Sequence, residues 1–430
     1  MERSDAAGMA PAVELKVRAA STWAGTIALL YLLALPGPPL LYNGSVLCIA
    51  AAGLALVAAY RRGLLSHPAV RDVLAVFACF WIPMVLASLD AHDANRSAGS
   101  SALYLRFALM GVFVAWALTS ALSRARLAVV LFCALWIVDA LVQALAGSNM
   151  FGFPYTGGQL MGLFYPKLQL GVVLSVFTPL VLDYLAQRAR THRAWWLALV
   201  PMAVVIALTL HRNSWLMFAL ACGLYATYWM VERRWRPRLG DSLVTVVVVA
   251  GLCGMLAQHD YLAQRVGTSV AAVFGAPQTL DAQLGQRPDI WRTAAAMAAA
   301  NWMNGIGPRG FRSAYGDYAE PDDYWLSHEP PKVPAHPHQL MLEVASETGA
   351  IGVIGYVLAL GLLWRRYRVL DPSARARAAP WLMCIVIAIF PLNIHKAFYG
   401  FFMASLVWWV LAAGIAALHV HDVGKTGDGC

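Results

Sequence analysis

The residues best suited to chemistry lie in a long polar segment, residues 259–339, and in the apolar segments on either side of it. Several arginines occur in this segment, and it ends with two histidines, His336 and His338. Arginine presents N–H donors in a planar fork that matches phosphate oxygens. Histidine titrates near neutrality and can accept a proton from a hydroxyl group. Together they predict a site that binds a phosphate-bearing substrate and activates a hydroxyl.

The stretch from Gly305 to Gly310, GIGPRG, matches the dinucleotide fingerprint G-x-G-x-x-G letter for letter. That fingerprint binds a nucleotide when it follows a buried strand and opens a helix within a soluble βαβ unit. Here it follows a short predicted helix, and Pro308 stands where the turn should enter the next helix. We therefore interpret the glycines, Gly307 among them, as residues that allow a tight turn and close backbone approach.

The composition is that of a membrane protein. Of the 430 residues, 60% are hydrophobic and 13% are charged, whereas soluble domains carry about a quarter charged residues. The net charge of +9 reflects basic loops rather than nucleic-acid binding, because Lys and Arg concentrate in the cytoplasmic loops of membrane proteins. The seven cysteines show no disulfide or metal-binding spacing and are interpreted as packing residues.

Apolar runs of about 20 residues predict an all-α polytopic membrane protein with about twelve transmembrane helices. Basic clusters, such as Arg61-Arg62 and QRARTHR at 187–193, follow even-numbered spans. The positive-inside rule then places both termini in the cytoplasm. No A-x-A-like cleavage site follows the first run, which we expect to be retained. The expected spans lie near 22–39, 42–60, 69–89, 102–122, 127–146, 166–186, 194–210, 215–231, 241–258, 340–364, 379–395 and 399–418.

These spans divide the chain into four parts. Residues 1–258 hold nine spans with short loops, 259–339 form a large periplasmic loop, 340–418 hold three more spans, and 419–430 form a cytoplasmic tail. A long ordered loop in an otherwise short-looped protein is usually functional. Within it, PDIWRTAAAMAAANWM at 288–303 predicts a helix with Pro288 in its first turn.

The polar motifs of the outward side follow one another in a defined order: Arg212, then Arg287 to Trp291, then Asn304 to Phe311, then His338, then Glu347, Gly349 and Gly352. This series resembles the O-antigen ligase family of bacterial membrane glycosyltransferases, which also contains O-antigen polymerases and pilin oligosaccharyltransferases. The family pattern is an Arg in a short outer turn, R-x-x-x-W, N/P-x-x-G-x-G-x-x-x-F, and a histidine followed by E-x-G-x-x-G. Two residues depart from it: Gln339 replaces the usual Asn, and His211 precedes the arginine where Ser is common.

The resemblance implies a GT-C-like enzyme of the bacterial inner membrane. Such an enzyme transfers O-antigen polysaccharide from undecaprenyl diphosphate to a terminal sugar of lipid A–core at the periplasmic face. The implied transfer inverts the anomeric centre and needs no metal, cofactor, nucleotide or nucleic acid. His338 is the expected general base. The residues expected to bind the diphosphate are Arg212, Arg265, Arg287 and Arg309, and those expected to support the site are His336, Glu347 and Gly307.

Plainer interpretations exist for several of these residues. Arg212 could be an interfacial anchor, and Arg287 could pair with Asp289. The two histidines alternate with Pro337 and are expected to point differently. A metal site made of His328, Glu329, His336 and His338 would match no standard zinc spacing.

Other charged residues also allow two readings. Glu343 and Glu347 lie on one face of the tenth span, where either is a candidate to orient His338 or to favour the positive end of the helix dipole. Arg106, near the outer end of its span, is a candidate substrate contact. Lys167 and Lys396 suit interfacial anchors as well as phosphate contacts.

Two rival functions stay open. A polymerase would perform the same chemistry on a different acceptor. A glycolipid flippase belongs to another class and should show charged residues in mid-span and repeat symmetry between its halves, whereas here the charges gather on one face.

Overall fold

The computed structural model describes residues 11–155, 158–232, 264, 266–267, 285–393 and 397–420. These residues form α-helices and short 3-10 turns, with no β-strand among them. The helices are α1 (Pro11–Ala34), α2 (Pro39–Ser66), α3 (Pro68–Ala87), α4 (Ala94–Thr119), α5 (Leu122–Ala146), α6 (Leu170–Arg188), α7 (Leu199–Leu208), α8 (Arg212–Glu232), α12 (Arg287–Ala300), α13 (Phe311–Tyr318), α14 (Leu340–Arg368), α15 (Pro372–Ala388) and α16 (Phe401–Ala417).

Local sequence explains where many helices begin and end. Proline occupies the first turn of α2, α3, α12 and α15, where its missing N–H has no intrahelical partner to lose. Asp93 caps α4 by accepting a hydrogen bond from the backbone N–H of Arg96. Gly147 ends α5 in the left-handed region, with φ +78°.

The predicted all-α membrane architecture is confirmed at the level of the helices. Seven helices are long and apolar enough to cross a membrane, and they coincide with seven of the twelve expected spans. The expected spans at 22–39, 194–210 and 399–418 appear as shorter apolar helices. The expected span at 379–395 corresponds to α15, which ends at Ala388. The expected span at 241–258 lies outside the described residues.

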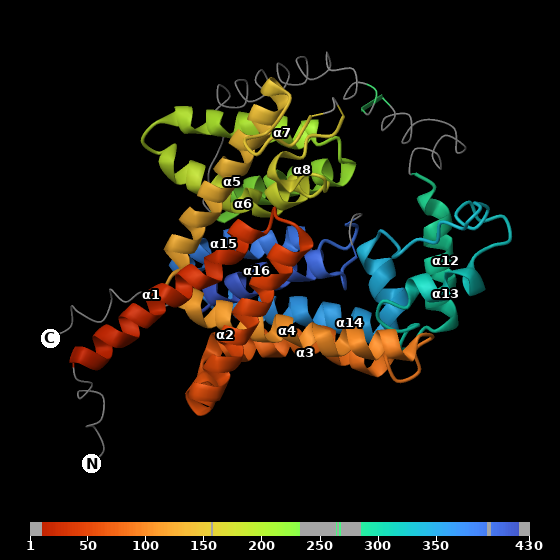
Figure 1. Cartoon of the computed structure of the whole chain (residues 1–430). Coiled ribbons are helices and arrows are strands. Elements are labelled where there is room, and N and C mark those ends of the chain that lie inside the picture. Colours follow the sequence, from red (N-terminus) through yellow and green to blue (C-terminus); the bar gives the residue numbers. More distant parts are fainter. Residues whose placement is uncertain are drawn as a thin grey trace.

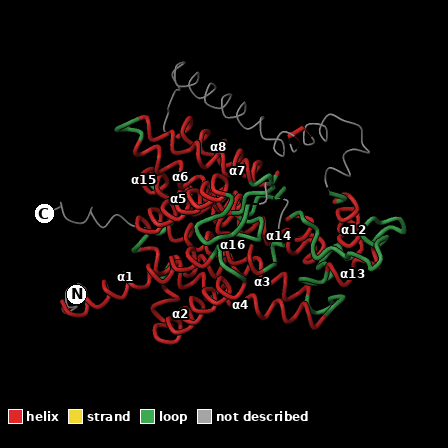
Figure 2. The backbone as a smooth tube through the Cα atoms, turned by 45° about the horizontal axis from the view of Figure 1, so that its top comes forward, coloured by secondary structure: helices red, strands yellow, loops and turns green. Residues whose placement is uncertain are grey.

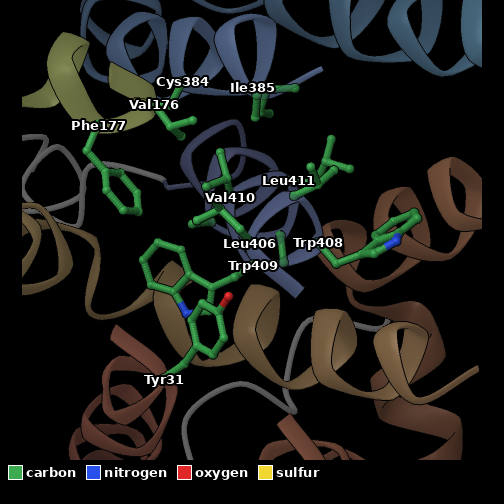
Figure 3. Close-up of a cluster of buried hydrophobic side chains, with 14 of the residues drawn as sticks. Tyr31, Val176, Phe177, Cys384, Ile385, Leu406, Trp408, Trp409, Val410 and Leu411 are labelled. Atoms are coloured by element: carbon green, nitrogen blue, oxygen red, sulfur yellow. The ribbon is translucent and has the colours of Figure 1, made fainter. Parts of the chain in front are cut away.

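Helix α16 occupies the centre of the bundle. Every residue from Phe402 to Ala417 is buried, so this helix is apolar on all sides because protein surrounds it. Trp408 and Trp409 lie among the buried side chains of this core (Figure 3). The Trp409 indole N–H donates to the Ala28 carbonyl, and the Trp408 indole N–H donates to the Tyr104 hydroxyl. A core built around α16 therefore ties the N-terminal helices to the last one.

Helices α12 and α13 form a separate layer at one end of the bundle, here called the α12 end (Figure 1). The helix expected at 288–303 is confirmed as α12. It packs on α13 through a small apolar core that includes Met297 and Phe311. Many of the loops gather near this layer and near the adjoining ends of α8, α14 and α16 (Figure 2). This is the end at which the chemically suited residues lie.

Candidate active site

Helix α14 is broken at Gly349, and the break creates the attachment point for the GIGPRG segment. Gly349 has φ +62° and ψ −161°, outside the helical region. The N–H groups just after the break are free of the helix: Ala350 donates to the Trp302 carbonyl at 2.8 Å and Ile351 to the Met303 carbonyl at 3.1 Å. A side chain at position 349 would overlap the backbone of Met303, so only glycine fits.

The glycines of GIGPRG serve this close approach. Ile306 N–H donates to the Ser346 carbonyl at 2.9 Å, and Gly307 N–H to the Glu347 carbonyl at 3.1 Å. Gly307 has φ +97°, and a Cβ there would overlap Ala91 and lie 2.5 Å from the Ser97 hydroxyl. The N–H groups of Ile306 and Gly307 are thus engaged with α14, not presented to a phosphate. The turn and close approach expected from the sequence are confirmed.

Two buried carboxylates of α14 hold two different loops. Glu347 Oε2 accepts a hydrogen bond from the backbone N–H of Arg309 at 2.7 Å, while its Oε1 has no hydrogen-bond partner among the described residues. Glu343 accepts from the backbone N–H groups of Phe398 and Tyr399 at 2.8 and 3.1 Å. Each glutamate therefore fixes a backbone segment. A role for either in orienting His338 stays a prediction.

The segment that carries the histidines is fastened on both sides. The Trp291 indole N–H of α12 donates to the Pro337 carbonyl at 3.1 Å. Gln339 caps α14 through a hydrogen bond from Leu342 N–H, and its amide donates to the Pro391 carbonyl. Gln339 thus retains an amide with two structural contacts at the position where the family has Asn.

The expectation that the two histidines point differently is wrong. The ring centroids of His336 and His338 lie 3.9 Å apart, with their planes at 41°. His338 has φ +54°, and this left-handed conformation turns its side chain back toward that of His336. The sign of φ at a non-glycine residue is not readable from alternation alone.

Arg212 is the first residue of α8, and hydrogen bonds through Asn393 connect its turn to the segment that carries the histidines. The side-chain amide of Asn213 donates to Asn393 Oδ1 at 2.6 Å, and both residues are buried. The backbone carbonyl of Asn393 accepts from Leu340 N–H at 3.1 Å. Asn393 therefore connects the arginine turn to the start of α14, two residues after His338. Neither asparagine was singled out in the sequence, where nothing distinguishes them from other polar loop residues.

His211, the second departure from the family pattern, has a local role. Its Nδ1 lies 2.9 Å from the Ser214 hydroxyl, within the first turn of α8. Arg287 begins α12, one turn before Trp291 on the same helix face, so it lies on the side of α12 that meets the histidine segment. Arg265 lies outside the described residues.

Left-handed backbone at non-glycine residues marks this end of the molecule. Four such residues occur among those the structure describes: Leu210, Gln286, Arg309 and His338. Two are candidate site residues themselves, and the others stand two residues before Arg212 and one before Arg287. Such conformations cost about 1–3 kcal/mol each and persist where the surroundings hold them. The candidate residues are therefore placed by strained backbone at the ends of helices.

The family comparison covers this same region. Residues 197–357 match the family model described as O-antigen ligase. This part of the chain belongs to the O-antigen ligase family. No curated protein matches the chain. The O-antigen ligase region begins before Arg212 and ends after Gly352, so it includes the break in α14. It identifies an integral membrane protein with a glycosyltransferase-like activity in O-antigen processing.

A metal ion in a protein site is held by a group of side chains such as His, Cys, Asp and Glu. Within the described ranges, no three His, Cys, Asp or Glu side chains are grouped as metal ligands would be. His328 lies apart from the two other histidines in its contacts, since its Nδ1 is 2.8 Å from the Tyr324 carbonyl. Arg292 is ion-paired with Asp289 and Glu320.

Proposed function

We propose that this protein is an O-antigen ligase. It transfers undecaprenyl-diphosphate-linked O-antigen polysaccharide to a terminal sugar of lipid A–core at the periplasmic face of the bacterial inner membrane. The observation that carries the proposal is the family match over residues 197–357. The matched region contains Arg212, Arg287, Arg309 and His338.

The chemistry assigned to these residues follows from the bond that breaks. The acceptor hydroxyl oxygen bonds to the anomeric carbon, the bond from that carbon to the diphosphate oxygen breaks, and the electron pair leaves with the diphosphate. His338 accepts the hydroxyl proton, a step that contributes about 10²–10⁴-fold in rate. The side-chain charges of Arg212, Arg287 and Arg309 stabilise the negative charge that the diphosphate gains. Arg265 is proposed to bind the diphosphate as well, on the basis of the sequence alone.

Direct displacement inverts the anomeric centre. The arginines supply the cationic stabilisation, and the lipid-diphosphate bond supplies the driving force, so the proposal requires no metal, cofactor or nucleotide. His336 contacts the base directly, Gly307 lets the loop meet α14, and Glu347 holds Arg309 in position. These three are the proposed supporting residues.

The proposed topology is that of a GT-C-like protein with twelve spans. Residues 1–258 contribute nine spans and 340–418 three, residues 259–339 form the periplasmic loop, and both termini, including the tail at 419–430, face the cytoplasm. Support comes from the seven long apolar helices and from basic loops at the end opposite α12.

The test is transfer by purified protein in reconstituted membranes that contain undecaprenyl-diphosphate glycan, lipid A–core and a chelator. We expect ligated lipopolysaccharide from wild type and about 10²-fold or greater loss from His338→Ala and from Arg287→Ala. Arg292→Ala, a loop arginine already paired with acids, is the matched control and should retain transfer.

Each other outcome points elsewhere. Glycan that lengthens on its carrier lipid would identify a polymerase with the same site. Lipid that crosses the bilayer without transfer would identify a flippase and refute the catalytic assignment.

A further inference from the structure

Arg106 is a charged residue inside an apolar helix, and nothing proposed so far uses it. It lies in α4, one of the seven helices long and apolar enough to span a membrane. Thirteen residues separate it from Thr119, the last residue of α4. At 1.5 Å per residue this is about 20 Å, roughly two-thirds of a 30 Å hydrocarbon core, toward the α12 end. The guanidinium thus lies at the depth of one leaflet.

Two aromatic rings hold the guanidinium in place. Its Cζ lies 4.2 Å from the ring centroid of Phe401 and 4.8 Å from that of Phe107. Rings attract a cation at such distances. Phe401 is also the first residue of α16, and Gly400 before it offers no side-chain cap. The positive end of the α16 dipole therefore lies beside Arg106 and adds to the local positive potential.

This positive charge has no counter-charge among the residues that the structure describes. Among the residues that the structure describes, Arg106 makes no ion pair and no hydrogen bond, and its Nε and Nη2 are buried without a partner. The Arg106 side chain as a whole is only partly buried. Leu103, Leu105 and Phe401 around it are exposed apolar side chains, with Phe401 49% exposed. An anion that pairs with this guanidinium from outside the bundle would approach it across these exposed apolar side chains.

Two titratable side chains in this part of the bundle already have other partners. Glu343 is committed to the N–H groups of Phe398 and Tyr399. Tyr104, the closest titratable side chain on α4, accepts a hydrogen bond from Trp408 in the bundle core. An uncompensated arginine at membrane depth is costly and marks a functional site unless an anion approaches it.

We propose that Arg106, fixed between Phe107 and Phe401, binds the phosphate of a membrane lipid on the α12 side of the bilayer. Arginine donates strong, charge-assisted hydrogen bonds to phosphate oxygens. The phosphate can belong to a polyprenyl diphosphate or to an anionic phospholipid, which offer the same chemistry. The site is a lipid-binding site at the flank of α4 and α16 and does not depend on the proposed transfer.

The experiment measures lipid binding directly, by native mass spectrometry of the full-length protein released from detergent. Three probes are added separately: undecaprenyl diphosphate, phosphatidylglycerol, and digalactosyl diacylglycerol, which has no phosphate. We expect Arg106→Gln to weaken binding of at least one phosphate lipid about tenfold or more and to leave the galactolipid unchanged. Whichever phosphate lipid responds identifies the source of the phosphate.

Two further variants keep the result interpretable. Arg106→Lys retains the charge and should bind more tightly than Arg106→Gln. Arg292→Gln removes the same charge from a site already paired with Asp289 and Glu320, and should bind as wild type does. Equal binding of both phosphate lipids to wild type and Arg106→Gln would overturn the proposal. So would an equal loss in Arg292→Gln, or an equal loss of the galactolipid. None of these readouts uses glycosyl transfer, so they stand apart from the ligase test.

Discussion

Replacing Asn393 by alanine tests whether the arginine turn and the histidine segment act as one unit. The change removes Oδ1, which accepts the 2.6 Å hydrogen bond from Asn213, and leaves that buried donor without its acceptor. It leaves the backbone bond from Leu340 to the carbonyl of residue 393 possible. A buried polar group that loses its partner costs about 1–3 kcal/mol. If that free energy is lost from the reactive arrangement, transfer falls about 5- to 150-fold.

The assay is the rate of transfer per folded molecule, with the folded fraction taken from thermal unfolding. Tyr225→Phe is the matched control, because it removes a buried hydroxyl that donates to Asp183 and accepts from Trp229, 13 residues along α8 from Arg212. It should lower thermal stability slightly and leave transfer per folded molecule unchanged. The reasoning is refuted if Asn393→Ala behaves like Tyr225→Phe.

A double-mutant cycle sharpens this test. Asn213→Ala removes the donor of the same hydrogen bond, so the double variant should lose little more activity than either single variant. Coupling of about 0.5–3 kcal/mol is typical of residues in contact. Additive losses would show that the two asparagines act independently and that the bridge does not position the site.

Three further changes have defined outcomes. Gly307→Ala should lower stability by about 1–3 kcal/mol and reduce transfer, because φ is +97° and a Cβ would overlap Ala91. Gly316→Ala is the control, because its Cβ would meet open space and the variant should unfold like wild type. Equal unfolding temperatures for the two variants would contradict the prediction for Gly307. Glu347→Leu should lower the transfer rate about 5- to 150-fold, because it leaves the Arg309 N–H without its acceptor. Glu347→Gln should retain more activity than Glu347→Leu, and the opposite ranking of the two rates would contradict the prediction. The Asp371 pKa is lowered to about 2, first by the hydrogen bond from the Ser373 hydroxyl and then by backbone N–H groups of α15. The ionised Asp371 side chain therefore stabilises the fold above the ordinary aspartate pKa, and this stabilisation is lost as pH falls toward about 2. Asp371→Ala should lower the unfolding temperature at neutral pH and have no such effect in acid.

The sequence predicted those features that depend on neighbouring residues. Long apolar runs predicted the helices that the structure shows, because a span is a local property of about 20 residues. Pro288 and the alanine-rich stretch after it predicted α12 for the same reason. The glycines of GIGPRG predicted close approach of the backbone, although not the partner they approach.

Features that depend on distant residues were not predictable. The break at Gly349 needs the carbonyls of residues 302 and 303 as partners, and the bridge through Asn393 joins segments 180 residues apart. The contact between the two histidine rings depends on the sign of φ at His338, which alternation along the chain does not determine. Short helices such as α16 can lie at the centre of a bundle only because other helices cover them, which their own sequence does not reveal.

The way the α12 layer is attached has a consequence for how it opens. At one side, residues 302–307 are bonded to the broken helix α14, and at the other, Gln339 and Leu340 are bonded to residues 391 and 393. The stretch from Tyr318 to Val333 is held inside the layer, because the Trp325 indole N–H donates to the Gln286 carbonyl and the Tyr315 hydroxyl donates to buried Asp323. We therefore expect residues 287–339 to exchange their amide hydrogens as one cooperative unit, and Asp323→Ala should raise exchange throughout that unit. Exchange raised only between residues 318 and 333 would show that this stretch opens by itself.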